Sequence, residues 1–321
     1  MIKLSKERQV SLISYQIYNL WKIWTQTSLI HYYYIMIFQE ISHCFNRAIK
    51  FSFAIKKFIF MCPVLLICWL IALFFRAIFL SVNSWAGIGM IFMPIFICNG
   101  ILLSSGILLI RIYYHDVKGV SFNIFKLFKN SLTVIFSASQ LSMPFVFVFL
   151  FTWIAIGVFY LIKSIGVIGE SISVILIFCP FVLIFISLVL SICSFLILFF
   201  ATPHIALKNL TNKNCVNFNL LKKITENLYK NIFLNMILLF ISLIPLAFCI
   251  LFLVLSIFIT FTNYTSLNSP IASTMKWFFI MIPSTFIITP FIIFFFNFAC
   301  ESYYILNKKN REGAYCEVNM V

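Results

Sequence analysis

The residues whose chemistry could serve an enzyme are few in this sequence. It contains four histidines and eight acidic residues. His115 and Asp116 are adjacent, and His204 directly follows Pro203. An enzyme that acts on a lipid or a phosphate ester needs titratable groups brought together as general acid and base. One hypothesis is therefore a composite site of His115, Asp116 and His204. The alternative is that the histidines lie singly at a membrane surface, with only the polar tip of the ring in water.

Motifs that would define a reaction are missing from the sequence. It has no His-Glu-x-x-His, no Gly-x-Ser-x-Gly, no glycine-rich phosphate loop and no acidic cluster for a divalent metal. Its ten cysteines include no Cys-x-x-Cys pair and no Cys/His spacing of a metal site. Most of them lie in apolar runs, where cysteine packs as a small hydrophobic residue. The sequence therefore predicts no catalytic residue, cofactor or metal ion, and it favours a non-enzymatic protein.

The composition shows which solvent surrounds these residues. Hydrophobic residues make up 63% of the 321 residues and charged residues 10%, against roughly 45–50% and 25% in a soluble domain. A helix crosses the hydrocarbon core of a bilayer with about 20 apolar residues. The runs without Lys, Arg, Asp, Glu or His that reach about this length are 58–75, 91–110, 143–162, 173–201, 233–262 and 277–299. They are continuous rather than alternating, so we predict an all-α polytopic membrane protein with six transmembrane helices in three hairpins.

Lysine and arginine are concentrated on one side of these predicted spans. The net charge is +15, and most of the 23 basic residues precede the first span, follow the sixth, or lie in the second and fourth connections. The other connections hold Arg76, Lys163 and Lys276, one each. Because cytoplasmic loops carry the excess of basic residues, both termini are predicted to be cytoplasmic, and the charge requires no nucleic-acid partner. The 41 phenylalanines, with much Ile, Asn and Lys, are typical of an AT-rich bacterial genome and indicate a bacterial cytoplasmic (inner) membrane.

Two short basic segments, 121–130 and 217–227, precede the third and fifth spans. Each reads Phe-Asn, two apolar residues and Lys. In a helix, their apolar residues would form one stripe and most of their lysines the opposite one. Such helices lie in the headgroup plane with lysine toward anionic lipid. The predicted lipid-binding residues of the inner leaflet are Lys126, Lys129, Lys222, Lys223 and Lys230.

The predicted organisation has an N-terminal cytoplasmic or interfacial segment (1–57), a transmembrane domain (58–300) and a cytoplasmic C-terminal tail (301–321). The hairpins are either a parallel pseudo-repeat or the ordinary alternation of an even number of spans. Prolines in the spans either break helices that line a cavity or are kinks that neighbouring helices tolerate. The absence of ionisable residues from the six runs argues against a proton-driven pump.

The chain after the sixth run reads Glu-Ser-Tyr-Tyr-Ile-Leu-Asn-Lys-Lys-Asn-Arg-Glu-Gly-Ala-Tyr, from Glu301 to Tyr315. This ending, with the loop after Pro203, resembles a group of six-span bacterial inner-membrane proteins related to the membrane domain of glycerophosphodiester phosphodiesterases. The resemblance implies a six-span fold and carries over no catalytic residue.

Three functions fit this sequence. The leading hypothesis is a non-enzymatic membrane protein that acts in membrane organisation or binds partners. A transporter or lipid-handling protein would instead need a polar cavity, lined by Asn99, Ser104 or Asn297. The third hypothesis, an intramembrane enzyme, would have to bring His115 and His204 to a common point.

Overall fold

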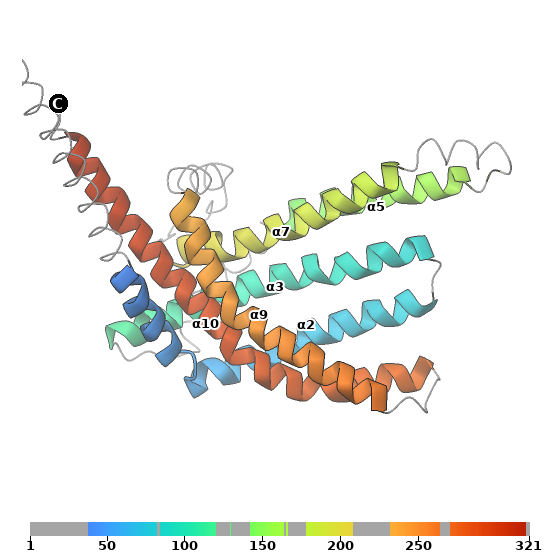
Figure 1. Ribbon diagram of the computed structural model, residues 1–321, viewed down its shortest axis with the longest axis horizontal. Helices are drawn as coiled ribbons and strands as arrows, with labels where there is room; N and C mark the ends of the chain where they lie inside the picture. The colour runs from blue at the N-terminus through green and yellow to red at the C-terminus, as the bar shows by residue number, and fades with distance from the viewer. Residues whose placement is uncertain are drawn as a thin grey trace, which may run out of the picture. The chain divides into compact units, whose positions relative to one another are not determined.

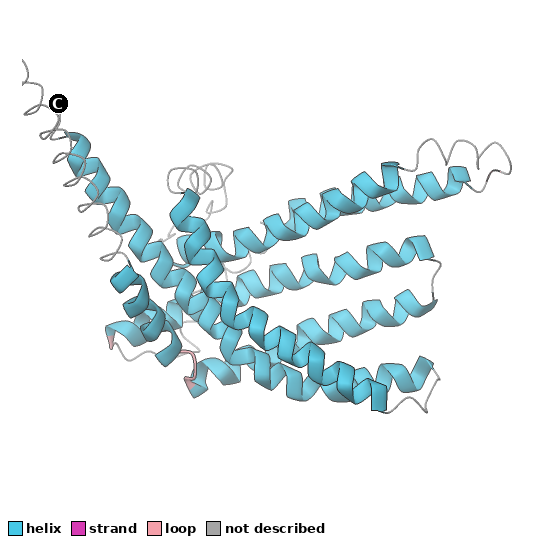
Figure 2. Ribbon diagram, in the orientation of Figure 1, coloured by secondary structure: helices cyan, strands magenta, loops and turns pink. Residues whose placement is uncertain are grey.

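The computed structural model describes residues 38–81, 84–119, 129, 142–163, 165, 178–207, 232–263 and 270–318. The chain divides into two compact units, Met1–Arg47 and Ala48–Val321. Over the described ranges the regular secondary structure is entirely helical (Figure 2). In the first unit, residues 38–47 belong to a helix that covers 38–50. The six long helices that the structure describes belong to the second unit.

The long helices are α2 (Ile55–Ser81), α3 (Ser84–Lys118), α5 (Met143–Lys163), α7 (Phe178–Leu207), α9 (Ile232–Asn263) and α10 (Pro270–Val318). Among the described residues, these six are long and apolar enough to cross a membrane. The predicted all-α, six-helix membrane fold is therefore confirmed. Helices α2, α3, α9 and α10 continue through their internal prolines without a break, as tolerated kinks require. Pro144 and Pro180 fall in the first turn of α5 and α7, where the missing N–H is not needed.

The helices are longer than the apolar runs that predicted them. The membrane-compatible stretches extend over Ile55–Phe79 in α2, Ile91–Lys118 in α3 and Met275–Lys308 in α10. They therefore include Lys57, Asp116 and Glu301, so the expectation that the spans lack ionisable residues is wrong for these helices. Charged residues do not in themselves end a helix, so α2 includes Lys57 and α3 includes Asp116. Helix α10 also continues to Val318, so much of the predicted tail is helical.

Within the second unit, consecutive helices pair as hairpins, and α3 and α10 lie at the centre. Helix α3 contacts α2, α5, α7 and α10, whereas α10 contacts α2, α3, α7 and α9. Figure 1 shows the helices meeting near the start of α2 and diverging toward the turns that follow α2, α5 and α9. We name these the convergent end and the divergent end. Because the number of long helices is even, the start of α2 and the part of α10 that follows its apolar run both lie at the convergent end.

The tightest packing lies at the convergent end. Buried side chains of α3, α7 and α10 are concentrated there, in residues 107–113, 198–206 and 293–302. Gly106 of α3 permits this close approach, because a Cβ at that position would collide with the ring of Phe296 on α10. Toward the divergent end many large apolar side chains are exposed, as expected where lipid is the solvent.

The basic segments 121–130 and 217–227 lie outside the described residues, except for Lys129. That residue is helical and exposed. Lipid binding by Lys126, Lys129, Lys222, Lys223 and Lys230 stays a prediction.

Candidate functional site

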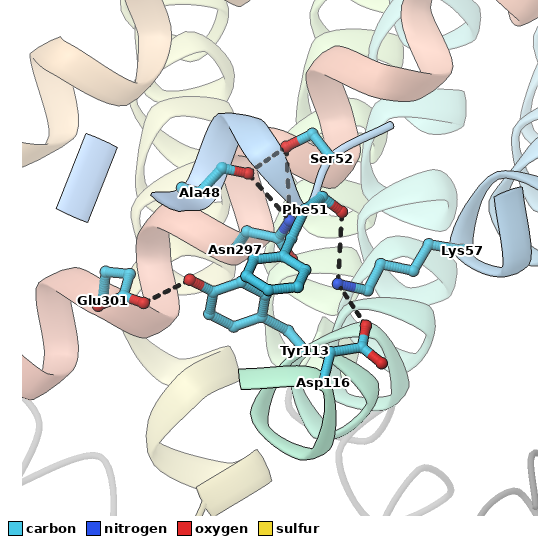
Figure 3. Close-up of polar contacts among 8 residues, drawn as sticks. All are labelled: Ala48, Phe51, Ser52, Lys57, Tyr113, Asp116, Asn297 and Glu301. Carbon is cyan, nitrogen blue, oxygen red and sulfur yellow. Dashed lines mark hydrogen bonds and ion pairs between the residues drawn. The ribbon is translucent and has the colours of Figure 1, made fainter. Parts of the chain in front are cut away.

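A lysine enclosed by protein forms the centre of the candidate site at the convergent end. The side chain of Lys57, near the start of α2, has no exposed surface. Its Nζ atom lies 3.0 Å from Asp116 Oδ2 and 3.4 Å from the carbonyl oxygen of Phe51 (Figure 3). It also lies 4.8 Å from the ring centroid of Tyr113 and 5.4 Å from that of Phe51. Burial of an ammonium ion is tolerated only with such compensation, which here comes from a carboxylate, a carbonyl and two aromatic faces.

Local structure explains why these groups meet. The helix over 38–50 ends in a turn closed by the hydrogen bond from Ser52 N to Ile49 O. The Lys57 and Phe58 amides then donate to Ala54 O as α2 begins. The turn places the carbonyl of Phe51 within reach of the Lys57 side chain. On α3, Tyr113 and Asp116 are three residues apart and so share one helix face.

Tyr113 connects this lysine to a second acidic residue. Its side chain is 1% exposed, and its hydroxyl donates a hydrogen bond to Glu301 Oε1 on α10. Glu301 is itself buried. The ring of Tyr113 packs edge-on against Phe51, at 5.8 Å between centroids. One tyrosine therefore offers its ring face to an ammonium group and its hydroxyl to a carboxylate (Figure 3).

Asn297 lies one turn before Glu301 on α10 and joins that helix to the segment before α2. Its Nδ2 atom donates to Ala48 O and to Ser52 Oγ, both at 3.4 Å. Ser52 Oγ donates to Ala48 O at 2.6 Å. Asn297 Oδ1 is buried and accepts no hydrogen bond from the described residues. Residues 48–57, α3 and α10 thus form one polar cluster, which we name the Lys57 cluster: Ala48, Phe51, Ser52, Lys57, Tyr113, Asp116, Asn297 and Glu301.

Other polar bonds attach α7 to α3 in the same way. Arg111 Nε donates to Ala206 O at 3.2 Å. Nearer the divergent end, Asn99 Nδ2 donates to Ser194 O at 3.1 Å. Asn99 and Asn297, which a transporter would use to line a cavity, are both buried and both donate to backbone carbonyls. Interhelical bonds of this kind are a recognised means of helix association in membranes.

The structure shows the following contacts for the residues of the predicted acid–base site. Asp116 pairs with Lys57. The ring of His204 is buried and packs edge-on against Tyr303 of α10, at 5.6 Å. The ring of His115 packs against its neighbour Tyr114. Among the described residues, no group of three or more His, Cys, Asp or Glu side chains could hold a metal ion.

Sequence reasoning singles out Asp116 and Asn297 but misses the other six members of the cluster: Ala48, Phe51, Ser52, Lys57, Tyr113 and Glu301. In the sequence Lys57 contributes only to the charge distribution, and Glu301 falls in the predicted tail. The spacing of Tyr113 to Asp116, and that of Asn297 to Glu301, could have indicated two polar helix faces at the ends of apolar runs. The pairing of Tyr113 with Glu301, 188 positions apart, has no local signal.

The fold and the buried polar cluster define a multi-pass, α-helical membrane protein. Comparisons with protein-family models, with curated proteins and with solved structures found no match.

Proposed function

We propose that the protein is a non-enzymatic, multi-pass component of a bacterial cytoplasmic membrane that binds other membrane proteins and so organises them. One observation carries the proposal: polar groups suited to a substrate site are bonded to the protein itself. Asn99, Asn297 and Asp116 each bond another part of the chain. The Nδ2 groups of the two asparagines and the carboxylate of Asp116 are engaged in this way, and such bonds tie parts of the chain together.

The apolar surface of α5 supports a role in partner binding. Phe147, Phe151, Ile154 and Leu161 follow helical spacing, so they form one stripe along the helix. Each of these side chains is more than 60% exposed. Aromatic residues are enriched in the cores of protein interfaces. A partner helix that covers this stripe would bury large, stiff side chains at little entropic cost.

Photo-crosslinking in living cells tests this role. A photoreactive phenylalanine analogue would replace, one at a time, Phe151 on α5, Phe240 on α9 and Phe279 on α10. These positions are matched in residue type and in exposure, at 75%, 60% and 69%. A partner predicts a protein adduct of discrete mass at one position, because a partner covers one side of the bundle. Lipid adducts alone at all three positions would contradict partner binding.

The proposed topology places the convergent end in the cytoplasm. The distribution of basic residues supports this orientation. A periplasm-active reporter should be inactive when fused after Val321 and active when inserted after Lys163. The opposite pattern would show that the topology is inverted.

In the proposed orientation, the lysines of segments 121–130 and 217–227 contact anionic lipid of the inner leaflet. A relation to the six-span bacterial inner-membrane proteins is part of this proposal, and the span count supports it.

A transporter or lipid-handling protein is the second candidate. It is favoured by the complete burial of Lys57 in a membrane-compatible helix, since ionisable residues within membranes often mark pathways. The two candidates differ at Ser104, which donates to Gly100 O within α3. A cysteine at position 104 should resist a membrane-impermeant thiol reagent if the bundle is packed dry. Rapid labelling there, as measured by peptide mass spectrometry, would favour the transporter.

A further inference from the structure

The divergent end carries an arginine that lies against a tryptophan of another helix. The guanidinium carbon of Arg76, near the end of α2, is 4.3 Å from the ring centroid of Trp277 on α10. We propose that these two residues form a binding site for the phosphate group of an anionic phospholipid. The site lies at the opposite membrane surface from the Lys57 cluster.

The depth of Arg76 in the membrane follows from helix geometry. Lys57 and Arg76 belong to the same continuous helix, Ile55–Ser81. At a rise of 1.5 Å per residue they are roughly 28 Å apart along its axis. The hydrocarbon core of a bilayer is about 30 Å thick. When Lys57 lies at one boundary, Arg76 lies at the other, where lipid phosphates and interfacial tryptophans are found.

Among the described residues, Arg76 has no anionic partner. Among the residues that the structure describes, Arg76 forms no ion pair, and its buried Nε atom donates no hydrogen bond. The connections at this end add Lys163 and Lys276, and their one acidic residue is Glu170, which lies outside the described residues. Arginine stays protonated at any physiological pH. An anionic ligand at this depth would balance the charge that the described residues leave without an anionic partner.

The chemistry of the guanidinium group selects the ligand. Its planar fork of N–H donors matches the oxygens of a phosphate or a carboxylate. The Nε–H group is covered by protein, so the terminal Nη groups must make the contact. The Trp277 ring holds the guanidinium plane by a cation–π interaction, which reduces the side-chain entropy lost on binding. At the headgroup level of a bilayer, phosphate is the abundant oxyanion.

Photoaffinity labelling of the full-length protein in vesicles tests the site. The vesicles contain phosphatidylglycerol that carries a photoreactive group on its headgroup. Mass spectrometry then counts adducts on the peptides around residues 76 and 277, and separately on the basic segments at 121–130 and 217–227. Because these segments are predicted to bind lipid independently, they serve as an internal control for folding and reconstitution.

Arg76→Gln should lower the adducts at the proposed site at least about tenfold, because it removes charge-assisted hydrogen bonds. The adduct yield of Arg76→Lys should lie between that of Arg76→Gln and that of the native protein, since an ammonium group keeps the charge but not the planar fork of donors. Lys163→Gln is the matched control: it removes one positive charge from the same end and should leave the yield unchanged. Adducts should be displaced by unlabelled phosphatidylglycerol and not by inorganic phosphate.

Three results would overturn the proposal. The first is an unchanged yield in Arg76→Gln with normal labelling of the basic segments. The second is an equal loss in Lys163→Gln, which would indicate general surface charge. The third is displacement by inorganic phosphate as effective as that by lipid, which would assign the site to the free anion.

Discussion

Removal of the carboxylate partner of Lys57 should destabilise the bundle more than removal of the lysine itself. The Lys57 side chain is 0% exposed, whereas that of Asp116 is 24% exposed. Asp116→Asn leaves an ammonium ion buried, and breaking a buried pair in this way costs about 3–5 kcal/mol. Lys57→Met leaves a carboxylate that can reach water and removes the cation–π contacts, so we expect about 1–2 kcal/mol. The loss in the free energy of unfolding of the double variant should be close to that of Lys57→Met, because no buried charge is left.

Unfolding in mixed micelles of dodecyl maltoside and dodecyl sulfate, followed by circular dichroism, measures these differences. Lys56→Met is the matched control, because Lys56 precedes Lys57 and is exposed. It should change the free energy of unfolding by less than about 0.5 kcal/mol. An ion pair between Lys57 and Asp116 makes the effects of the two substitutions non-additive. If the losses in the single variants are equal and add in the double variant to within about 0.5 kcal/mol, the ion pair does not exist as described.

Three further predictions concern the same bundle and use the same unfolding assay unless stated. Tyr113→Phe should cost about 1–3 kcal/mol, because it leaves Glu301 buried without this donor; a neutral result would remove the bond from the cluster. Gly106→Ala should cost about 1–3 kcal/mol, because its methyl group meets an aromatic ring of α10; unchanged stability would mean that α3 and α10 are further apart. Cys98 Sγ lies 3.5 Å from the carbonyl oxygen of Cys68. Mild oxidation with copper phenanthroline should therefore join these two cysteines by a disulfide. If a protease site is inserted after Ser81, the cleaved chain should then still run as one species on a non-reducing gel. Separation of the two fragments would contradict the register of α2 against α3.

The helices could be predicted well from the sequence because lipid imposes a simple rule. Uninterrupted apolar runs of the required length have no other stable state in a bilayer, so each run became a helix of the fold. The helix ends are less predictable. The first charged residue marks the boundary of an apolar run at Lys57 and at Arg111, yet both helices include these residues. Whether a charge can enter a span depends on its partner, and Asp116 is distant in sequence from Lys57. The Lys57 cluster is therefore a tertiary feature.

The two charged residues that mark the ends of the apolar part of α2 differ in how they are neutralised. Lys57 is enclosed by a carboxylate, a carbonyl and two rings from three parts of the chain. Arg76 lies on one indole ring, and its Nε atom has no acceptor among the described residues. A buried charge that other parts of the chain neutralise holds those parts together, and the Lys57 cluster lies at the end where α3, α7 and α10 are most buried. In the proposed site, lipid phosphate takes the place of such a protein partner for Arg76. The proposed site also predicts that added phosphatidylglycerol raises the thermal stability of the native protein more than that of Arg76→Gln. An equal gain in both would mean that lipid stabilises the bundle without using Arg76.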